Sequence, residues 1–133
     1  MRMTRGACLC GAVQYEVAGD FDAAFNCHCS RCRRATGAAC KPMAVTRSGN
    51  VRLVKGQADL LIHGTPPGSH DVHCRQCGSF LYSHIAENGN IHVAMGTLVD
   101  APGIQPQFHI FVGSKASWHE ITDDLPCFEE FPG

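Results

Sequence analysis

The sequence lacks an excess of charge of either sign. Eleven basic residues stand against twelve acidic ones, for a net charge of −1. Nucleic acids and anionic membranes are bound through a basic surplus, so we expect neither as a partner. Long hydrophobic runs are also missing, which excludes a membrane-spanning helix. The N-terminus has no apolar segment of the kind found in signal peptides, and we therefore expect a cytoplasmic protein.

Signals for helices are few, whereas signals for strands are frequent. Residues 12–18 alternate, with Val13, Tyr15 and Val17 on one face and polar residues on the other. Further segments rich in β-branched and aromatic residues, separated by turn residues, cover 51–56, 58–64, 79–85, 90–99 and 108–114. Only residues 30–37 look helical, ending at Gly37. The sequence predicts one domain over residues 1–133, mainly β, with antiparallel sheets and one or two short helical turns.

Nine cysteines are present in the 133 residues. In a reducing compartment such a number is seldom a disulfide framework, and an odd count fits one poorly. Seven of them fall into three short clusters, and Cys40 and Cys127 stand alone. Metal ligation is therefore the leading interpretation.

Two of the clusters can form one closed metal site. Cys74 and Cys77 form a C-x-x-C-G knuckle, which brings two thiolates to one metal and needs two further ligands. Cys8 and Cys10 can supply these, because side chains at i and i+2 of an extended segment point the same way. We predict a structural zinc site with four cysteine ligands.

The third cluster, Cys27, Cys29 and Cys32, has no fourth cysteine at ligand spacing. Three protein ligands and one open position are typical of a reactive zinc. Cys40 could close the site and make it inert, and this alternative stays open. His28 is a poorer fourth ligand, because an extended segment points it away from its neighbours. A thioredoxin-like redox pair is weakly supported, since the βαβ setting is missing.

These motifs together resemble the glutathione-dependent formaldehyde-activating enzyme family, which has the Mss4-like fold and includes the centromere protein V/GFA domains. The resemblance extends over the segments GACLCGAVQYEV, CHCSRCRRATG, HCRQCGSFLY, MGTLVD, FHIFVGSKASW and DDLPCF. It implies two zinc ions per chain, one structural and one catalytic, with the same ligands that the counting gives. Val72 and His73 replace an arginine and an aromatic residue that usually precede the knuckle, which bears on substrate identity.

A zinc ion with three thiolates is electron-rich and suits a soft fourth ligand, such as an incoming thiol. The resemblance implies a carbon–sulfur lyase or synthase that joins glutathione, or a similar small thiol, to formaldehyde or a related small aldehyde. Arg33 and Arg34 could pair with the carboxylates of such a thiol. The alternative is a non-catalytic Mss4-like zinc-binding module for protein interaction. His73 and His109 are further residues whose roles the sequence leaves open.

Overall fold

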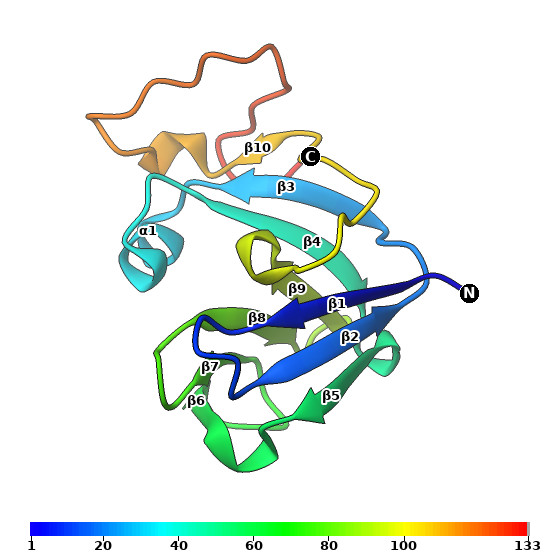
Figure 1. The fold of residues 1–133 in the computed structure, drawn as a ribbon. Coiled ribbons are helices and arrows are strands. Elements are labelled where there is room, and N and C mark those ends of the chain that lie inside the picture. Colours follow the sequence, from blue (N-terminus) through cyan, green and yellow to red (C-terminus); the bar gives the residue numbers. More distant parts are fainter. Residues whose placement is uncertain (133) are drawn as a thin grey trace.

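Two β-sheets make up the protein in the computed structural model, which describes residues 1–132. The smaller sheet has the order β1–β2–β5, with bounds Met3–Ala7, Gln14–Ala18 and Val51–Lys55. The larger sheet has the order β10–β3–β4–β9–β8–β7–β6. In that order its strands are His109–Ile110, Ala23–Cys27, Lys41–Arg47, Asn90–Ala94, Phe80–Ile85, His70–Cys74 and Leu60–Gly64. Figure 1 shows β1 and β2 lying across the larger sheet.

The predicted mainly β fold is confirmed. The alternation predicted over residues 12–18 is also confirmed, since Val13, just before β2, and Tyr15 and Val17 within it are at most 1% exposed. All strand pairs are antiparallel except the short pairing of β10 with β3, which is parallel. The turn at Asn88 and Gly89 joins β8 to β9, with Gly89 at a φ of 71° that a glycine adopts without strain.

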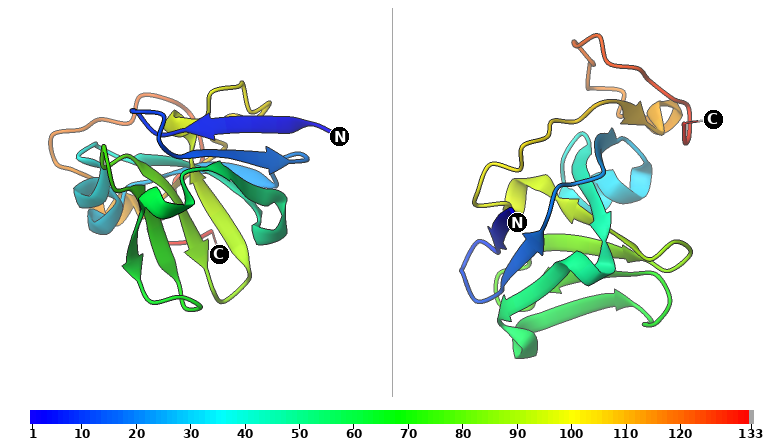
Figure 2. Two further views of the ribbon diagram at one scale, coloured as in Figure 1. Left: turned by 60° about the horizontal axis from the view of Figure 1, so that its bottom comes forward. Right: turned by 90° about the vertical axis from the view of Figure 1, so that its right-hand side faces the viewer.

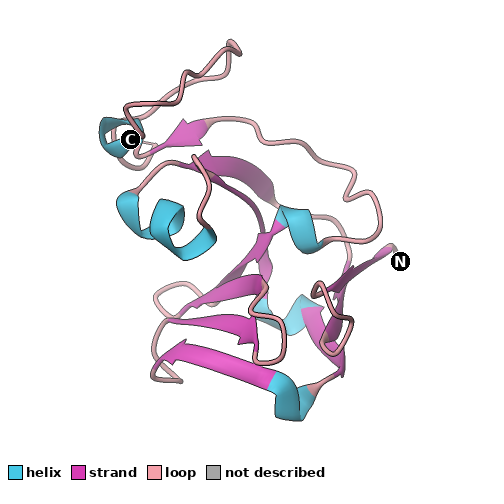
Figure 3. Cartoon of the chain, turned by 60° about the vertical axis from the view of Figure 1, so that its left-hand side comes forward, coloured by secondary structure: helices cyan, strands magenta, loops and turns pink. Residues whose placement is uncertain are grey.

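One α-helix, α1 (Ser30–Thr36), lies where it was predicted and ends at Gly37 with a φ of 68°. Within residues 1–132 there are also four three-residue 3₁₀ turns, more than the one or two helical turns expected. They cover Ser48–Asn50, Gln57–Asp59, Met95–Thr97 and Val112–Ser114. A single 3₁₀ turn is too short to carry a hydrophobic period, so these turns have no signal in the sequence pattern. Figure 3 distinguishes these helical segments from the strands. Within residues 1–132, no helix is long and apolar enough to cross a membrane.

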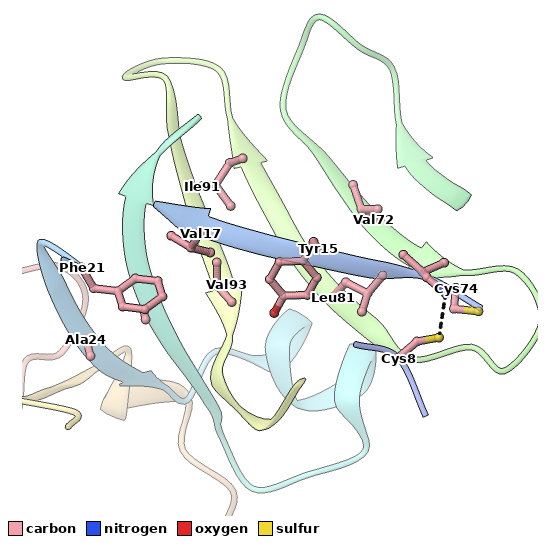
Figure 4. Close-up of a cluster of buried hydrophobic side chains, with 12 residues drawn as sticks. Cys8, Tyr15, Val17, Phe21, Ala24, Val72, Cys74, Leu81, Ile91 and Val93 are labelled. Carbon is pink, nitrogen blue, oxygen red and sulfur yellow. Dashed lines mark hydrogen bonds between the residues drawn. The ribbon is translucent and has the colours of Figure 1, made fainter. Parts of the chain in front are cut away.

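The larger sheet is covered on both faces. On one face a core cluster joins it to the smaller sheet, and Figure 4 shows Tyr15 and Val17 of β2 beside Leu81 and Val93 of the larger sheet. On the other face a second cluster contains Phe25, Cys27, Met43, Val45 and Ile110. Aromatic residues from the C-terminal segment, Phe108, Phe111 and Phe128, pack against this second cluster. The right-hand view of Figure 2 shows the orange and red part of that segment projecting away from the sheets at one end of the molecule.

Candidate metal centres and their cavity

The first cysteine cluster gathers Cys8, Cys10, Cys74 and Cys77, whose sulfur atoms all lie within 4.8 Å of one another. The Cys8 and Cys10 sulfurs are 3.7 Å apart, and those of Cys10 and Cys74 are 3.8 Å apart. Zinc–sulfur bonds of about 2.3 Å in a tetrahedron place sulfurs about 3.8 Å apart. The four thiols are therefore spaced for one tetrahedral metal ion that ties the start of the chain to its middle.

Three of the sulfurs in this first cluster have hydrogen-bond donors that favour their thiolate form. The backbone N–H of Val13 donates to the Cys8 sulfur at 3.2 Å, and that of Cys77 donates to the Cys74 sulfur at 3.4 Å. The Ser79 hydroxyl lies 3.2 Å from the Cys77 sulfur, and its hydrogen bond is the main reason that the pKa of Cys77 falls to about 5. Because donors favour the thiolate form, they favour metal binding.

The local conformation around Cys8 differs from the prediction. Cys8 to Cys10 lie in a turn after β1, closed by the hydrogen bond from the Gly11 N–H to the Cys8 carbonyl at 3.1 Å, and not in an extended segment. The turn still directs both sulfurs to the same side, so the predicted ligand pair is brought together for a different geometric reason.

The second cluster consists of Cys27, Cys29 and Cys32, also within 4.8 Å of one another. Cys27 ends β3, Cys29 is the N-cap of α1, and Cys32 lies in its first turn. The Cys29 sulfur accepts the Cys32 backbone N–H at 3.3 Å. A hydrogen bond with the Cys27 sulfur first, then burial, and then the repulsion between two adjacent thiolates raise the pKa of Cys32. A bound cation would relieve this repulsion, so the donor set fits a metal.

The structure places both proposed fourth ligands outside the second cluster. Cys40 is half-buried, and its sulfur is not a member of the cluster. Burial first, and then the nearby Cys32, raise the pKa of Cys40. His28 is completely buried and points elsewhere. Its Nε2 shares a hydrogen bond of 2.8 Å with Nδ1 of His109. Among residues 1–132, three sulfurs are the only ligand atoms gathered at this point.

His28 and His109 form a buried chain that ends at Asp123. His109 Nε2 donates to both carboxylate oxygens of Asp123, at 3.1 and 3.0 Å. When His109 is neutral its Nδ1 accepts, so His28 Nε2 donates to it and His28 Nδ1 carries no proton. Burial first, and then the neighbouring His109, lower the pKa of His28 to about 4, which keeps the His28 ring neutral. The chain fixes the loop between Cys27 and Cys29 to the C-terminal segment.

A cavity of about 500 Å³ opens beside the second cluster. All three of its cysteines line the cavity, together with apolar groups that include Phe25 and Phe111. Of the two arginines proposed as carboxylate partners, Arg34 lines the cavity and Arg33 does not. Arg31, which was not proposed for this role, also lines the cavity. His73 is not part of this wall; its ring packs against Phe80 at 4.5 Å.

The polar floor of the cavity was not predicted. Lys41 is only 3% exposed, and its Nζ donates to the Ser83 hydroxyl at 3.4 Å. Ser83 in turn donates to Asp71 at 2.6 Å. Burial lowers the pKa of Lys41 to about 8, although the thiols and Asp71 act in the opposite direction. A lysine beside a lone cysteine gives no sequence signal of burial, since only the pairing of distant strands encloses it.

The fold and the two centres define a class: a two-sheet β protein with two cysteine clusters placed to hold metal ions. Residues 3–114 match the family model described as glutathione-dependent formaldehyde-activating enzyme, and the chain belongs to this family. It is similar to a Halomonas elongata protein that carries the provisional name of a glutathione-dependent formaldehyde-activating enzyme. The two are 25% identical over 141 residues, covering 98% of this chain and 89% of the relative.

The fold is also similar to the crystal structure of a Rhodobacter sphaeroides protein. That match has a TM-score of 0.60 and 29% identity, and it covers 77% of this chain and 97% of the other. The family predicted from the cysteine motifs is therefore confirmed, and both cysteine clusters could bind metal ions.

Proposed function

We propose that the protein is a zinc-dependent carbon–sulfur lyase or synthase. It joins a small thiol such as glutathione to formaldehyde or a related small aldehyde, giving an S-hydroxymethyl adduct, or catalyses the reverse cleavage. The observation that carries this proposal is the position of the three-cysteine cluster on the wall of a cavity of about 500 Å³. Cavities of about 300–1,000 Å³ accommodate small-molecule ligands. Family membership supports the same reaction class.

The two clusters take different roles in this proposal. Cys8, Cys10, Cys74 and Cys77 hold a structural zinc ion, and Cys27, Cys29 and Cys32 hold a catalytic one. When bound by three thiolates, zinc supplies an open, soft position at which a substrate thiol loses its proton. A cavity next to only three sulfurs gives such a thiol a route to this position.

The cavity walls suit a peptide-like thiol. The exposed Arg31 and Arg34 lie at the cavity mouth, where their guanidinium groups can pair with substrate carboxylates. Phe25 and Phe111 provide apolar surface that excludes water from the reacting groups. Arg33 does not line the cavity, so a role in substrate binding is less well supported for Arg33 than for Arg34.

The reaction balances without a further reactant. The thiol releases its proton to solvent, and the sulfur lone pair forms a bond to the carbonyl carbon. The carbonyl π electrons move to oxygen, which takes up one proton from water. The chain's own contribution is to hold the two reactants together and to exclude competing water.

The alternative of a non-catalytic interaction module receives less support. A module that acts by binding other proteins gains nothing from a metal cluster beside a small-molecule cavity, and closure of the cluster by Cys40 would have favoured it.

Exchange NMR with ¹³C-formaldehyde and glutathione tests the proposal, because the adduct also forms without a catalyst and only its rate is informative. The zinc-loaded protein should raise the exchange rate in proportion to its concentration, and Cys29→Ser should abolish the increase. Cys127→Ser, at an exposed lone thiol, serves as the control. An exchange rate equal to the protein-free rate would contradict the proposal.

A further inference from the structure

A row of polar side chains crosses the cavity face of the larger sheet. His92, Ser83 and Asp71 stand opposite one another on β9, β8 and β7, and the apolar Val45 of β4 lies on the other side of His92. Opposed residues of antiparallel strands project to the same face, so the row lies on the side of the second core cluster. His92, Ser83 and Asp71 all line the cavity. Polar residues thus replace the apolar ones that an ordinary sheet face would bury.

Lys41 reaches this row from beside the metal centre. It pairs with Cys27 in the register between β3 and β4, so both side chains leave the sheet on the same face. Met43 and Val45, two and four residues further along β4, are buried on that face in the second core cluster. The ammonium therefore lies at the base of the cavity, next to the ligands of the second cluster.

The Lys41 ammonium is enclosed but incompletely partnered. None of the ion pairs formed within residues 1–132 includes it. Of its three N–H groups, one donates to Ser83, whose own hydroxyl proton is committed to Asp71. The Phe80 ring lies on another side, 3.2 Å from Nζ to the ring centroid. At least one donor remains for a ligand, and a buried cation without a paired anion is costly to maintain.

We propose that Lys41, held by Ser83, forms an oxyanion subsite that binds the carbonyl oxygen of the aldehyde. This inference rests on the proposed function for its chemistry. As the sulfur attacks carbon, the π electrons move to oxygen, and the Lys41 N–H donates a hydrogen bond to the developing charge. A preorganised donor in a water-poor site stabilises such charge more than water does. The alkoxide then takes its proton from solvent, which restores the proton lost by the thiol.

A carboxylate of the substrate thiol could also accept a hydrogen bond from the Lys41 ammonium, in place of the aldehyde oxygen. Its position favours the aldehyde oxygen, because Lys41 lies at the base of the cavity opposite Cys27, whereas Arg31 and Arg34 offer exposed partners for carboxylates. To distinguish the aldehyde oxygen from a carboxylate of the thiol, the assay is run with glutathione and, separately, with 2-mercaptoethanol, which has no carboxylate.

The test compares Lys41→Met with Lys55→Met in the full-length, zinc-loaded protein, since Lys55 is an exposed lysine at the end of β5. Sodium formate serves as a small oxyanion probe, with binding followed by ¹³C line broadening. Lys41→Met should weaken formate binding at least tenfold and lower kcat about 100-fold with both thiols, while KM for glutathione changes less than threefold. Lys55→Met should match the unmodified protein. Lys41→Gln, which keeps an uncharged NH₂ donor group, should give intermediate values and replaces Lys41→Met if the latter does not fold.

The outcomes separate the subsite from the reaction. Formate binding that depends on Lys41, without any acceleration of thiol–aldehyde exchange, supports the oxyanion subsite and rejects the proposed function. Formate binding unchanged in Lys41→Met overturns the subsite. A rise in KM for glutathione alone, with 2-mercaptoethanol unaffected, also overturns it and assigns Lys41 to the thiol's carboxylate.

Discussion

The two cysteine clusters use the same ligand in opposite structural settings. The first joins residues 8–10 to residues 74–77 and contributes Cys8 and Cys74 to the core between the two sheets. The second draws its three cysteines from six consecutive positions and lies on the far face of the larger sheet, at a cavity. A metal in the first would constrain the whole chain, while a metal in the second would constrain one loop.

The two clusters differ both in the number of sulfurs and in their surroundings. Four sulfurs enclosed by backbone donors leave no position for a substrate, whereas three sulfurs beside a cavity leave one. The surroundings agree with this division: the first cluster adjoins apolar residues, and the second adjoins Lys41 and a row of polar side chains.

The largest expected effect is at the first cluster. Cys77→Ser removes one of four ligands from a site that links distant segments, and metal binding at such a site contributes directly to folding free energy. We expect this variant to be insoluble, or to melt at least 20 °C lower in a thermal denaturation followed by circular dichroism. Cys127→Ser should melt like the unmodified protein. A Cys77→Ser protein of normal stability would show that the first cluster is not structural.

The matched change at the second cluster should leave the fold intact. Cys29→Ser removes a ligand whose partners lie within the same loop and in α1, so little chain is released. Metal analysis should find one zinc ion per chain in place of two, with the melting temperature lowered by only a few degrees. Cys40→Ser should keep both ions, because Cys40 lies outside the cluster. Loss of a zinc ion in Cys40→Ser would instead make Cys40 the closing ligand.

The histidine pair should have a smaller effect, confined to the second cluster. His109→Phe leaves Nε2 of the fully buried His28 without its acceptor, which should lower the free energy of unfolding by about 1–3 kcal/mol. Because His28 lies between two ligands, zinc should also dissociate faster from the second cluster. Urea denaturation and zinc release to a chromogenic chelator measure the two effects. Faster release from the first cluster as well would contradict a local role.

The smallest effect concerns pH. Burial, with the charge of Lys41 second, lowers the pKa of His92 to about 4. A histidine with a lowered pKa stays neutral in the folded protein, so below pH 6.5 the unfolded chain binds the proton first and stability falls as the pH drops toward 4. His92→Phe should lose less stability than the unmodified protein between pH 6.5 and pH 5 in urea titrations. Parallel curves would contradict the shifted pKa.

The sequence predicted the mainly β fold, several of its strands and both cysteine clusters. Clean alternation located β2, and the short spacings of the cysteines identified both clusters. It did not predict β1, β3, β4 or β7. In β4 the residues Met43 to Thr46 are all buried, because sheet and core cover both faces, and the alternation that marks a half-exposed strand is therefore absent.

The cavity floor could not be predicted because it depends on pairings between distant strands. The register of β3 with β4 brings Lys41 beside Cys27, and neither residue carries a local sign of it. An irregularity in the pairing of β7 with β8 shifts the register so that His73 pairs with Phe80, and Phe80 then lies under the Lys41 ammonium. His109, the partner of His28, lies 81 residues away in the sequence, and Asp123 lies a further 14 residues along the chain. Such contacts belong to the tertiary fold.

The central claim, that one metal centre is closed and the other open, is tested most directly by cobalt spectroscopy. Cobalt should replace zinc at both clusters, and each thiolate ligand adds sulfur-to-metal charge-transfer absorption. Glutathione at millimolar concentration should add absorption equivalent to one further thiolate on one of the two cobalt ions, and none in Cys29→Ser. An unchanged spectrum of the unmodified protein would contradict the open centre, as would a change of equal size in Cys29→Ser.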